Sequence, residues 1–292
     1  MSAWTSGTTA SGGSGHSPWC QRWRSRRHSW RHRSEGGFDQ ARYEVAPLVE
    51  REARPFVEAN HYSGSYPAAR FAYGLHDGPW LVGTAVLSVP VQSAVLTSLF
   101  PDLEPLSESL ELGRFVLADS VPANAETWFL ARVWELAAAT GLRGVVSFSD
   151  PVARSTVDGL RVFPGHVGLI YQAGNATYHE RSTPRTQLLL PDGRVLSART
   201  VQKIRAGERG AAAGERLLVG LGARARRPGE DRPDWLRDAL GRVGVRRIRH
   251  HGSHRYAFRV GPRRRLIQLG LPPAAPPCPC EPCRVRLDGR AA

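Results

Sequence analysis

The spacing of apolar residues predicts several β-strands in the central part of the chain. Apolar and polar residues alternate over 70–76 and 80–89, on either side of the turn signal Asp77-Gly78-Pro79, which is typical of a hairpin. Short apolar or alternating runs predict further strands over residues 110–117, 144–148, 167–172 and 186–190.

Helical patterns lie between these strands. The clearest begins after Asn124, whose side chain is expected to cap the first turn, and it continues to Gly141. Shorter helices are predicted over residues 48–59, 198–206 and 214–221. The order of helix, hairpin, strand, helix and strands indicates an α/β core, with helices flanking a mixed central sheet.

The two ends of the chain have a different composition. Residues 1–37 are rich in Ser, Gly, Arg and Trp without a period, so we expect a disordered basic arm or a start site placed too far upstream. The core is predicted to span 38–223. An Arg-rich linker leads from it to a small basic α+β module over 224–271, and a disordered tail rich in Pro and Cys follows over 272–292. The predicted elements of the module are a helix over 233–240 and strands over 246–249 and 256–260.

The net charge of +14 is not spread evenly along the chain. Residues 1–37 carry a net charge of +5, residues 38–223 carry −2, and residues 224–292 carry +11. The core is therefore nearly neutral. If the protein binds DNA, we expect the arm and the module to supply the affinity, which should weaken steeply with salt.

Several protein classes are excluded by composition. No stretch reaches about 18 apolar residues, which argues against a transmembrane helix. The N-terminus has no apolar run before a cleavage site, so we expect no secretory signal and a protein of the reducing cytoplasm. Four cysteines among 292 residues do not form a disulfide scaffold. Three of them, Cys278, Cys280 and Cys283, could hold zinc or could be exposed thiols.

Candidate chemistry lies at the ends of predicted strands, where ligands collect in open α/β sheets. Ser147 lies in the strand over 144–148, and Asp150 follows the end of that strand. Asp150 is either a functional carboxylate or the cap of a turn. His166 lies between two glycines and is a candidate base, a metal ligand or a structural histidine. Tyr171 follows in the same segment.

Two further candidates lie nearer the N-terminus. His61 and Tyr62 directly follow the helix over 48–59, where they serve either function or helix capping. Arg114 lies within an apolar strand and needs an anion, water, or an ion pair with Glu111 or Glu126.

Taken in order, these blocks resemble the Mom family of phage DNA-modification proteins over roughly residues 46–206. The resemblance rests on Asn60-His61-Tyr62-Ser63, Leu81-Val82-Gly83, Glu111-Leu112-Gly113-Arg114-Phe115-Val116, Val121-Pro122-Ala123-Asn124-Ala125-Glu126, Val146-Ser147-Phe148-Ser149-Asp150, Gly165-His166-Val167-Gly168-Leu169-Ile170-Tyr171-Gln172-Ala173 and Asn175.

The resemblance implies an acetyltransferase-like (GNAT) fold that acts on double-stranded DNA in the cytoplasm of a bacterial host. The implied reaction converts the N6 amine of adenine to an N6-carbamoylmethyl form, which protects phage or prophage DNA from restriction. The implied active-site residues are His61, Tyr62, Arg114, Ser147, Asp150 and Tyr171. An iron requirement is also implied, with His61, Asp150 and His166 as candidate ligands, since nitrogen and oxygen donors suit that metal.

One departure concerns acetyl-CoA. Acetyltransferases of this fold bind pyrophosphate with a glycine-rich turn before a helix, but here the junction over 119–124 has no glycine, and Pro122 removes one amide. The helix start at Asn124, Ala125 and Glu126 is still a candidate anion site. The sequence therefore does not indicate acetyl-CoA as the donor.

Three functions remain open from the sequence. A DNA adenine modification enzyme is favoured, with Asp150 or His166 as base, Arg114 as anchor, and Tyr62 or Tyr171 as a stacking or proton-transfer group. The alternatives are an N-acyltransferase acting on a small-molecule or protein amine, and a DNA-binding protein without enzymatic activity.

Overall fold

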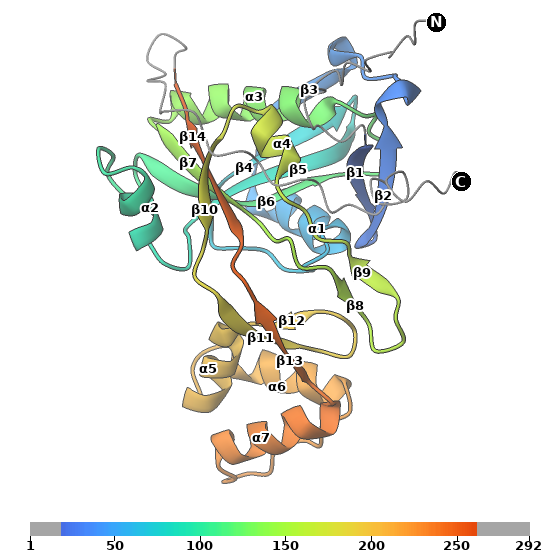
Figure 1. The fold of residues 1–292 in the computed structure, drawn as a ribbon, viewed down its shortest axis with the longest axis vertical. Helices are drawn as coiled ribbons and strands as arrows, with labels where there is room; N and C mark the ends of the chain where they lie inside the picture. Colours follow the sequence, from blue (N-terminus) through green and yellow to red (C-terminus); the bar gives the residue numbers. More distant parts are fainter. Residues whose placement is uncertain (1–18, 262–292) are drawn as a thin grey trace, which may run out of the picture.

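The computed structural model describes residues 19–261 and contains a seven-stranded mixed sheet (Figure 1). Neighbouring strands are antiparallel except for the central pair β6 and β7, which is parallel. This arrangement confirms the predicted α/β core with a mixed sheet. In sheet order the strands are β10 (Thr177–Arg181), β14 (His254–Arg259), β7 (Gly144–Ser149), β6 (Ser109–Leu117), β5 (Trp80–Ser88), β4 (Ala69–Asp77) and β3 (Tyr43–Leu48).

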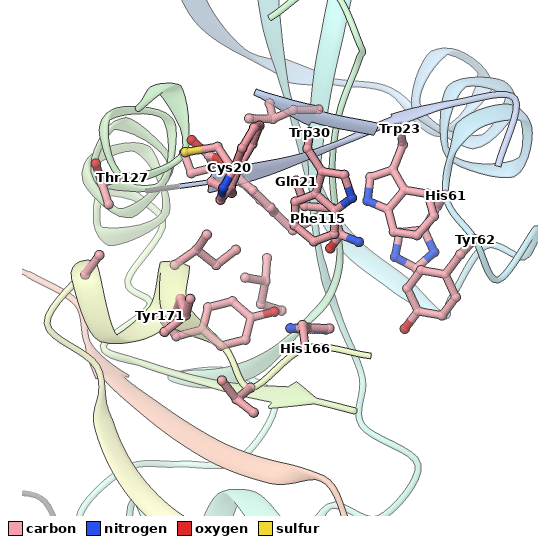
Figure 2. A pocket seen from close by; sticks show the side chains of 18 of the residues that line it. Cys20, Gln21, Trp23, Trp30, His61, Tyr62, Phe115, Thr127, His166 and Tyr171 are labelled. Carbon is pink, nitrogen blue, oxygen red and sulfur yellow. The ribbon is translucent and has the colours of Figure 1, made fainter. Parts of the chain in front are cut away.

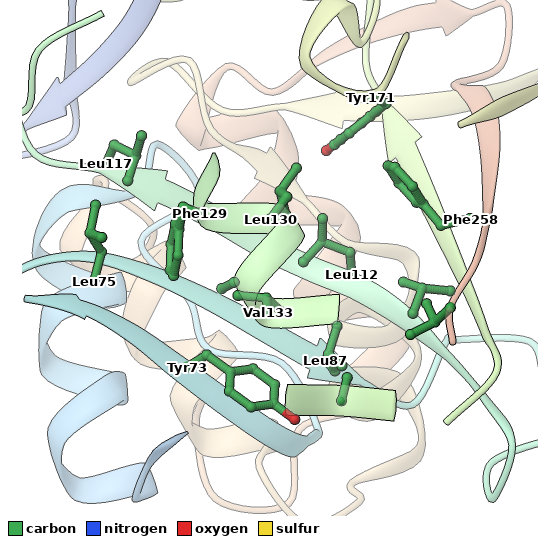
Figure 3. Close-up of a cluster of buried hydrophobic side chains, with 14 of the residues drawn as sticks. Tyr73, Leu75, Leu87, Leu112, Leu117, Phe129, Leu130, Val133, Tyr171 and Phe258 are labelled. Carbon is green, nitrogen blue, oxygen red and sulfur yellow. The ribbon is translucent and has the colours of Figure 1, made fainter. Parts of the chain in front are cut away.

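Helices cover both faces of this sheet. On one face α3 (Ala125–Ala139) buries Phe129, Leu130 and Val133, whose helical spacing directs them into the largest apolar cluster (Figure 3). On the other face α1 (Glu50–Asn60) buries Ala53 and Val57 against β4, β5 and β6. A short helix, α2 (Ala94–Leu99), follows β5. Among residues 19–261, no helix is long and apolar enough to cross a membrane.

The parallel strands β6 and β7 separate partway along their length. They pair only over three residues, from Ser109 with Gly144 to Glu111 with Val146. Immediately afterwards the register between β5 and β6 shifts at Gly113, which is the extra residue of a β-bulge. A side chain at Gly113 would collide with Ser88, so only glycine fits there. The bulge and the divergence open the sheet at its centre.

The N-terminal segment forms a hairpin of β1 (Trp19–Arg24) and β2 (Arg27–His32). The prediction of a disordered arm over 1–37 is therefore wrong for this part of it. High arginine content concealed an alternation with a period of two, in which Trp19, Gln21 and Trp23 share one face. Trp23 is buried against α1 and β6.

The predicted module over 224–271 is not a separate unit. Its helix α7 (Arg232–Val243) and strand β13 (Arg246–His250) pack with elements that precede the predicted boundary, because Trp235 lies in one apolar cluster with Leu190 and Ile204. These elements belong to an insert, residues 182–250, that also contains β11 (Arg185–Leu189), β12 (Val195–Leu196), α5 (Ala198–Ala206) and α6 (Ala211–Gly220).

Along the chain, the insert follows β10 and precedes β14, and these two strands are antiparallel neighbours in the central sheet. The predicted linker over 224–228 is instead fixed, since Arg224 forms ion pairs with Glu230 and Asp238. The strand predicted over 256–260 is β14, and it belongs to the central sheet. The predicted Pro/Cys-rich tail, including Cys278, Cys280 and Cys283, lies outside the described residues.

One predicted strand, over 167–172, is a helix. Gly165 and Gly168 adopt left-handed φ angles of 76° and 78°, which breaks extended structure and starts α4 (Leu169–Ala173). Two short strands, β8 (Arg154–Ser155) and β9 (Arg161–Phe163), form a small hairpin between β7 and α4.

Candidate active site

A cavity of about 160 Å³ lies where β6 and β7 diverge (Figure 2). The N-terminal hairpin, the segment after α1, β6, the start of α3 and the loop leading into α4 all contribute to its walls. The lining residues include Gln21, Trp23, Trp30, Arg33, His61, Tyr62, Arg114, Phe115, Asn124, Glu126, His166 and Tyr171.

Aromatic rings form a continuous wall on one side of this cavity. The ring of His61 lies 4.2 Å from that of Tyr62 and 6.3 Å from that of Trp23, measured between centroids. Tyr62 in turn stacks on Phe163 at 4.2 Å. Such a wall suits a flat, apolar ring system, because stacked rings bury their faces together.

His61 is held as a neutral ring. It follows the last residue of α1, and its Nδ1 accepts the backbone N–H of Ser63 at 3.2 Å, so the ring hydrogen is on Nε2. Burial lowers the pKa of His61 well below its usual value, and the nearby positive charge of Arg114 lowers it further. His61 is therefore an uncharged imidazole at neutral pH.

Arg114 is oriented by backbone and hydroxyl groups. Its Nε donates to the Ser65 carbonyl at 3.0 Å, and one terminal nitrogen donates to the Ser65 hydroxyl at 2.9 Å. The other donates to the Gly113 carbonyl at 2.6 Å, and no carboxylate among residues 19–261 forms an ion pair with Arg114. The predicted pairing with Glu111 or Glu126 is thus not formed, and Arg114 keeps its charge available at the cavity wall.

His166 and Tyr171 form the opposite side, with ring centroids 6.3 Å apart. Burial lowers the pKa of His166 to about 4, although the negative charge of Asp150 opposes this shift. Burial also raises the pKa of the Tyr171 phenol. Both groups are neutral at physiological pH, so His166 has a free lone pair and Tyr171 keeps its proton.

Asp150 does not line the cavity. Its Oδ2 accepts from Arg154 at 2.5 Å, and its Oδ1 accepts from Nε2 of His250 at 2.9 Å. These partners hold the pKa of the carboxyl well below its usual range despite burial. The Arg154 guanidinium lies 4.3 Å from the centre of the Phe163 ring. Asp150 therefore supports the aromatic wall through Arg154.

Ser147 is fully buried on β7, next to Tyr171, and is likewise not a cavity residue. Of the six residues predicted as catalytic, the structure brings four together around the cavity: His61, Tyr62, Arg114 and Tyr171. The two from the end of β7, Ser147 and Asp150, lie behind its walls.

The predicted iron ligands do not assemble into a metal site. His61 and His166 face the same cavity, but both Asp150 oxygens are occupied by Arg154 and His250. Within residues 19–261, no group of three His, Cys, Asp or Glu side chains is placed to hold a metal ion. The donor set does not fit a three-ligand iron centre.

The start of α3 does not fit a pyrophosphate either. Asn124 adopts a left-handed φ of 70° and its side chain makes no capping hydrogen bond, contrary to the prediction. Ala125 is buried in the core. Glu126 places a carboxylate there, paired with Arg22 at 2.5 Å, and Arg22 also donates to the Val121 carbonyl. A carboxylate already fills this position, and it would repel a second anion.

The sequence alone did not point to the hairpin residues, to Arg154 or to His250. The alternation of Trp19, Gln21 and Trp23 was a usable signal for the hairpin. His250 had no local signal, because its contact with Asp150 spans 100 residues.

Two solved structures show a distant likeness to this chain. FeeM, an N-acyl amino acid synthase from uncultured soil microbes, is 18% identical with a TM-score of 0.28, covering 38% of this chain and 72% of that chain. A tandem GNAT protein from the clavulanic acid biosynthesis pathway is 14% identical with a TM-score of 0.33, covering 75% of each chain. These low TM-scores describe no more than a distant likeness. No curated protein matches the chain.

The model of one protein family, the Mom protein family, also matches the chain. The match covers residues 42–272, from the start of the central sheet through the insert, and it includes His61, Tyr62, Arg114 and His166. The N-terminal hairpin precedes it. Since the match extends over most of its length, the chain belongs to the Mom protein family.

Proposed function

We propose that this protein modifies the N6 amine of adenine in double-stranded DNA, giving an N6-carbamoylmethyl-type adduct that protects the DNA from restriction. Membership of the Mom family supports a modification protein of the acyltransferase-like kind. The single observation that carries the proposal is the aromatic cavity, in which Trp23, Tyr62 and Tyr171 surround neutral imidazoles.

A base can reach such a cavity only when it leaves the helix. The N6 amine of adenine is paired inside duplex DNA, so the enzyme has to flip the nucleotide or open the groove. Stacking on aromatic side chains compensates for the lost stacking within the duplex. Arg33 and Arg114 at the cavity supply cations for the phosphates that flank a flipped base.

The reaction needs a general base that accepts a proton from N6 and a cation that binds the negative charge of the donor or of DNA. The lone pair of N6 is delocalised into the purine ring, so the amine is a weak nucleophile until a base accepts one of its protons. As the bond between N6 and the donor carbon forms, the bond from that carbon to its leaving group breaks, and the leaving group departs with the electron pair. We assign the N6 proton to His166, which lines the cavity with a free lone pair.

The other candidate base, Asp150, is less suited. It does not line the cavity, and its two oxygens already accept hydrogen bonds from Arg154 and His250. We assign it as a positioning residue that holds Arg154 against Phe163 and the aromatic wall. Arg114 is the anchor for negative charge on the donor or on DNA, since its guanidinium is already oriented by Ser65.

The test is chemical analysis of DNA from bacteria that express the protein. Digestion to nucleosides and mass spectrometry should reveal a deoxyadenosine heavier by a carbamoylmethyl group. The variant His166→Asn should abolish the adduct, whereas His179→Asn, which removes a half-buried histidine that does not line the cavity, should not. Unmodified DNA in cells with soluble wild-type protein and an intact donor supply would contradict the proposal.

A further inference from the structure

The N-terminal hairpin presents an aromatic face to the cavity, with a single amide at its centre. Side chains alternate along a strand, so Trp19, Gln21 and Trp23 project from one face of β1. Gln21 pairs with Trp30 across the hairpin, which places the Trp30 ring beside the amide on the same face. Trp19, Gln21, Trp23 and Trp30 all line the cavity.

The opposite face of the hairpin fixes this wall in place. Arg22 is fully buried and pairs with Glu126 on α3 at 2.5 Å. On β2, Ser29 donates to the Asp119 carboxylate and Arg31 donates to the Asp119 carbonyl at 3.0 Å. The aromatic face is therefore held in a fixed position relative to the core, as a specificity element requires.

The side-chain amide of Gln21 has an unsatisfied hydrogen-bond donor on this wall. Its Nε2 is buried, and none of residues 19–261 accepts a hydrogen bond from it. Figure 2 shows Gln21 with Trp30 and Phe115 over the middle of the cavity, facing Tyr171 and His166. A buried amide without a partner is destabilising, so the fold gains nothing from a glutamine at this position.

We propose that Gln21 reads the edge of the flipped adenine while Trp30 stacks on its face. An amide offers an acceptor next to a donor, and adenine offers the complementary amine next to a ring nitrogen. On the edge that carries N7, adenine offers the N6 amine beside the N7 acceptor, whereas guanine offers two acceptors, O6 and N7, and has no hydrogen for the Gln21 oxygen to accept. The inference rests on the proposed function, and it assigns base specificity to a hairpin that lies before the family match.

This contact is compatible with the chemistry. The Gln21 Oε1 accepts one N6–H, while the second N6–H is transferred to His166 as the new bond to N6 forms. The product amine keeps one hydrogen, so the hydrogen bond to Gln21 persists through the reaction. Accepting from N6–H also raises electron density on N6, which favours its attack.

The test measures base discrimination by binding. The full-length protein is titrated against duplexes that carry adenine, guanine or unsubstituted purine opposite an abasic site, which lowers the cost of flipping. Fluorescence anisotropy at fixed salt gives each Kd. The variants are Gln21→Leu and, as a matched control, the same change at the exposed Gln92.

The wild type should bind the adenine duplex most tightly. Gln21→Leu should weaken that binding by about tenfold to a hundredfold and bring the three duplexes close to equal affinity. The Gln92→Leu variant should behave as the wild type. Because leucine removes an unpaired buried amide, the Tm of Gln21→Leu should be unchanged or higher, which separates loss of recognition from loss of fold.

Two results overturn this inference. One is a folded Gln21→Leu protein that keeps the wild-type preference for adenine, and the other is a wild type without any preference. The mass-spectrometric assay separates these failures from a failure of the proposed function: adenine modified by the wild type and equally by Gln21→Leu would remove the role of Gln21 and leave the function intact.

Discussion

Arg22 on the N-terminal hairpin and Glu126 on α3 form an ion pair of 2.5 Å, and both side chains are almost completely buried. The pair joins residues 104 positions apart in the chain. It attaches the hairpin wall of the cavity to the helix that covers the central sheet. A buried pair of this kind stabilises little as a whole, but removing one partner leaves an uncompensated charge.

Replacing Arg22 by Met should therefore be strongly destabilising. We expect a loss of about 3–5 kcal/mol in the free energy of unfolding, measured by urea denaturation. The double variant Arg22→Met with Glu126→Leu should recover most of this loss, because no charge remains buried. Arg24→Met, at an exposed position on the same strand, is the control and should change little. Equal effects of Arg22→Met alone and in the double variant would contradict this account.

Glu111 should make stability depend on pH. Burial raises the pKa of its carboxyl from 4.5 to about 7, so the folded protein holds a proton there that the unfolded chain releases. This contribution is complete below pH 4.5 and disappears as the pH rises through 7. Glu111→Gln should thus stabilise the protein at pH 8, by up to about 3 kcal/mol, and have little effect at pH 4.5.

The measurement for Glu111 is the Tm of wild type and variant across this pH range. Glu44→Gln, which changes an exposed carboxylate on β3, provides the comparison and should give a difference that does not vary with pH. A parallel pair of curves for the wild type and Glu111→Gln would show that Glu111 ionises as an ordinary exposed carboxylate.

Gly168→Ala should disturb Tyr171 directly. A Cβ at this position would lie 2.6 Å from the Tyr256 ring and 2.8 Å from the Tyr171 ring, at a backbone φ of 78°. We expect a destabilisation of about 2–4 kcal/mol from backbone strain and overpacking, together with loss of modification. Gly141→Ala is a matched control, because its φ is 90° but no atom lies within 4 Å. A cost equal to that of the control would show that the Tyr171 ring moves without difficulty.

The insert should contribute to DNA affinity through its charge. Residues 182–250 carry 16 basic and 7 acidic residues, a net charge of +9. Arg247 and Arg249 lie exposed on β13, and neither has an ion-pair partner among residues 19–261. Replacing both by Gln should weaken duplex binding and reduce the slope of log K against log salt by roughly 1–2.

Fluorescence anisotropy with a short duplex at several salt concentrations measures this slope. The control is Arg237→Gln, which removes an exposed charge already paired with Asp234 on α7. An unchanged slope in the double variant would place the DNA on another surface.

Local patterns in the sequence were enough to predict much of the core. Alternation identified β4, β5, β6 and β7, and helical spacing identified α1 and α3, because each of these elements buries one regular face. The blocks around His61, Arg114 and Tyr171 pointed to residues that meet at one cavity. Their order along the chain was informative even though each block alone was not.

Long-range contacts account for what the sequence did not reveal. The hairpin was hidden because its arginines resemble a disordered arm until Arg22 is seen to have a buried partner in Glu126. The sequence left open whether Asp150 is a functional carboxylate or the cap of a turn, because Arg154 and His250 reach it only in the folded chain. The boundary at 224 failed because Trp235 completes a cluster begun at Leu190, and no local pattern shows which cluster an apolar residue joins.

The position of β14 has a consequence for how the chain matures. Val145 and Val146 on β7 pair with Phe258 and Ala257 on β14. One edge of β7 therefore stays unpaired until β14 has been synthesised. The ribosome must first release the whole insert, which folds around its own cluster. Sequence separation this large slows folding, and β7 stays an open edge meanwhile. Nascent chains halted before residue 254 would therefore offer this edge to chaperones or to other copies of the chain.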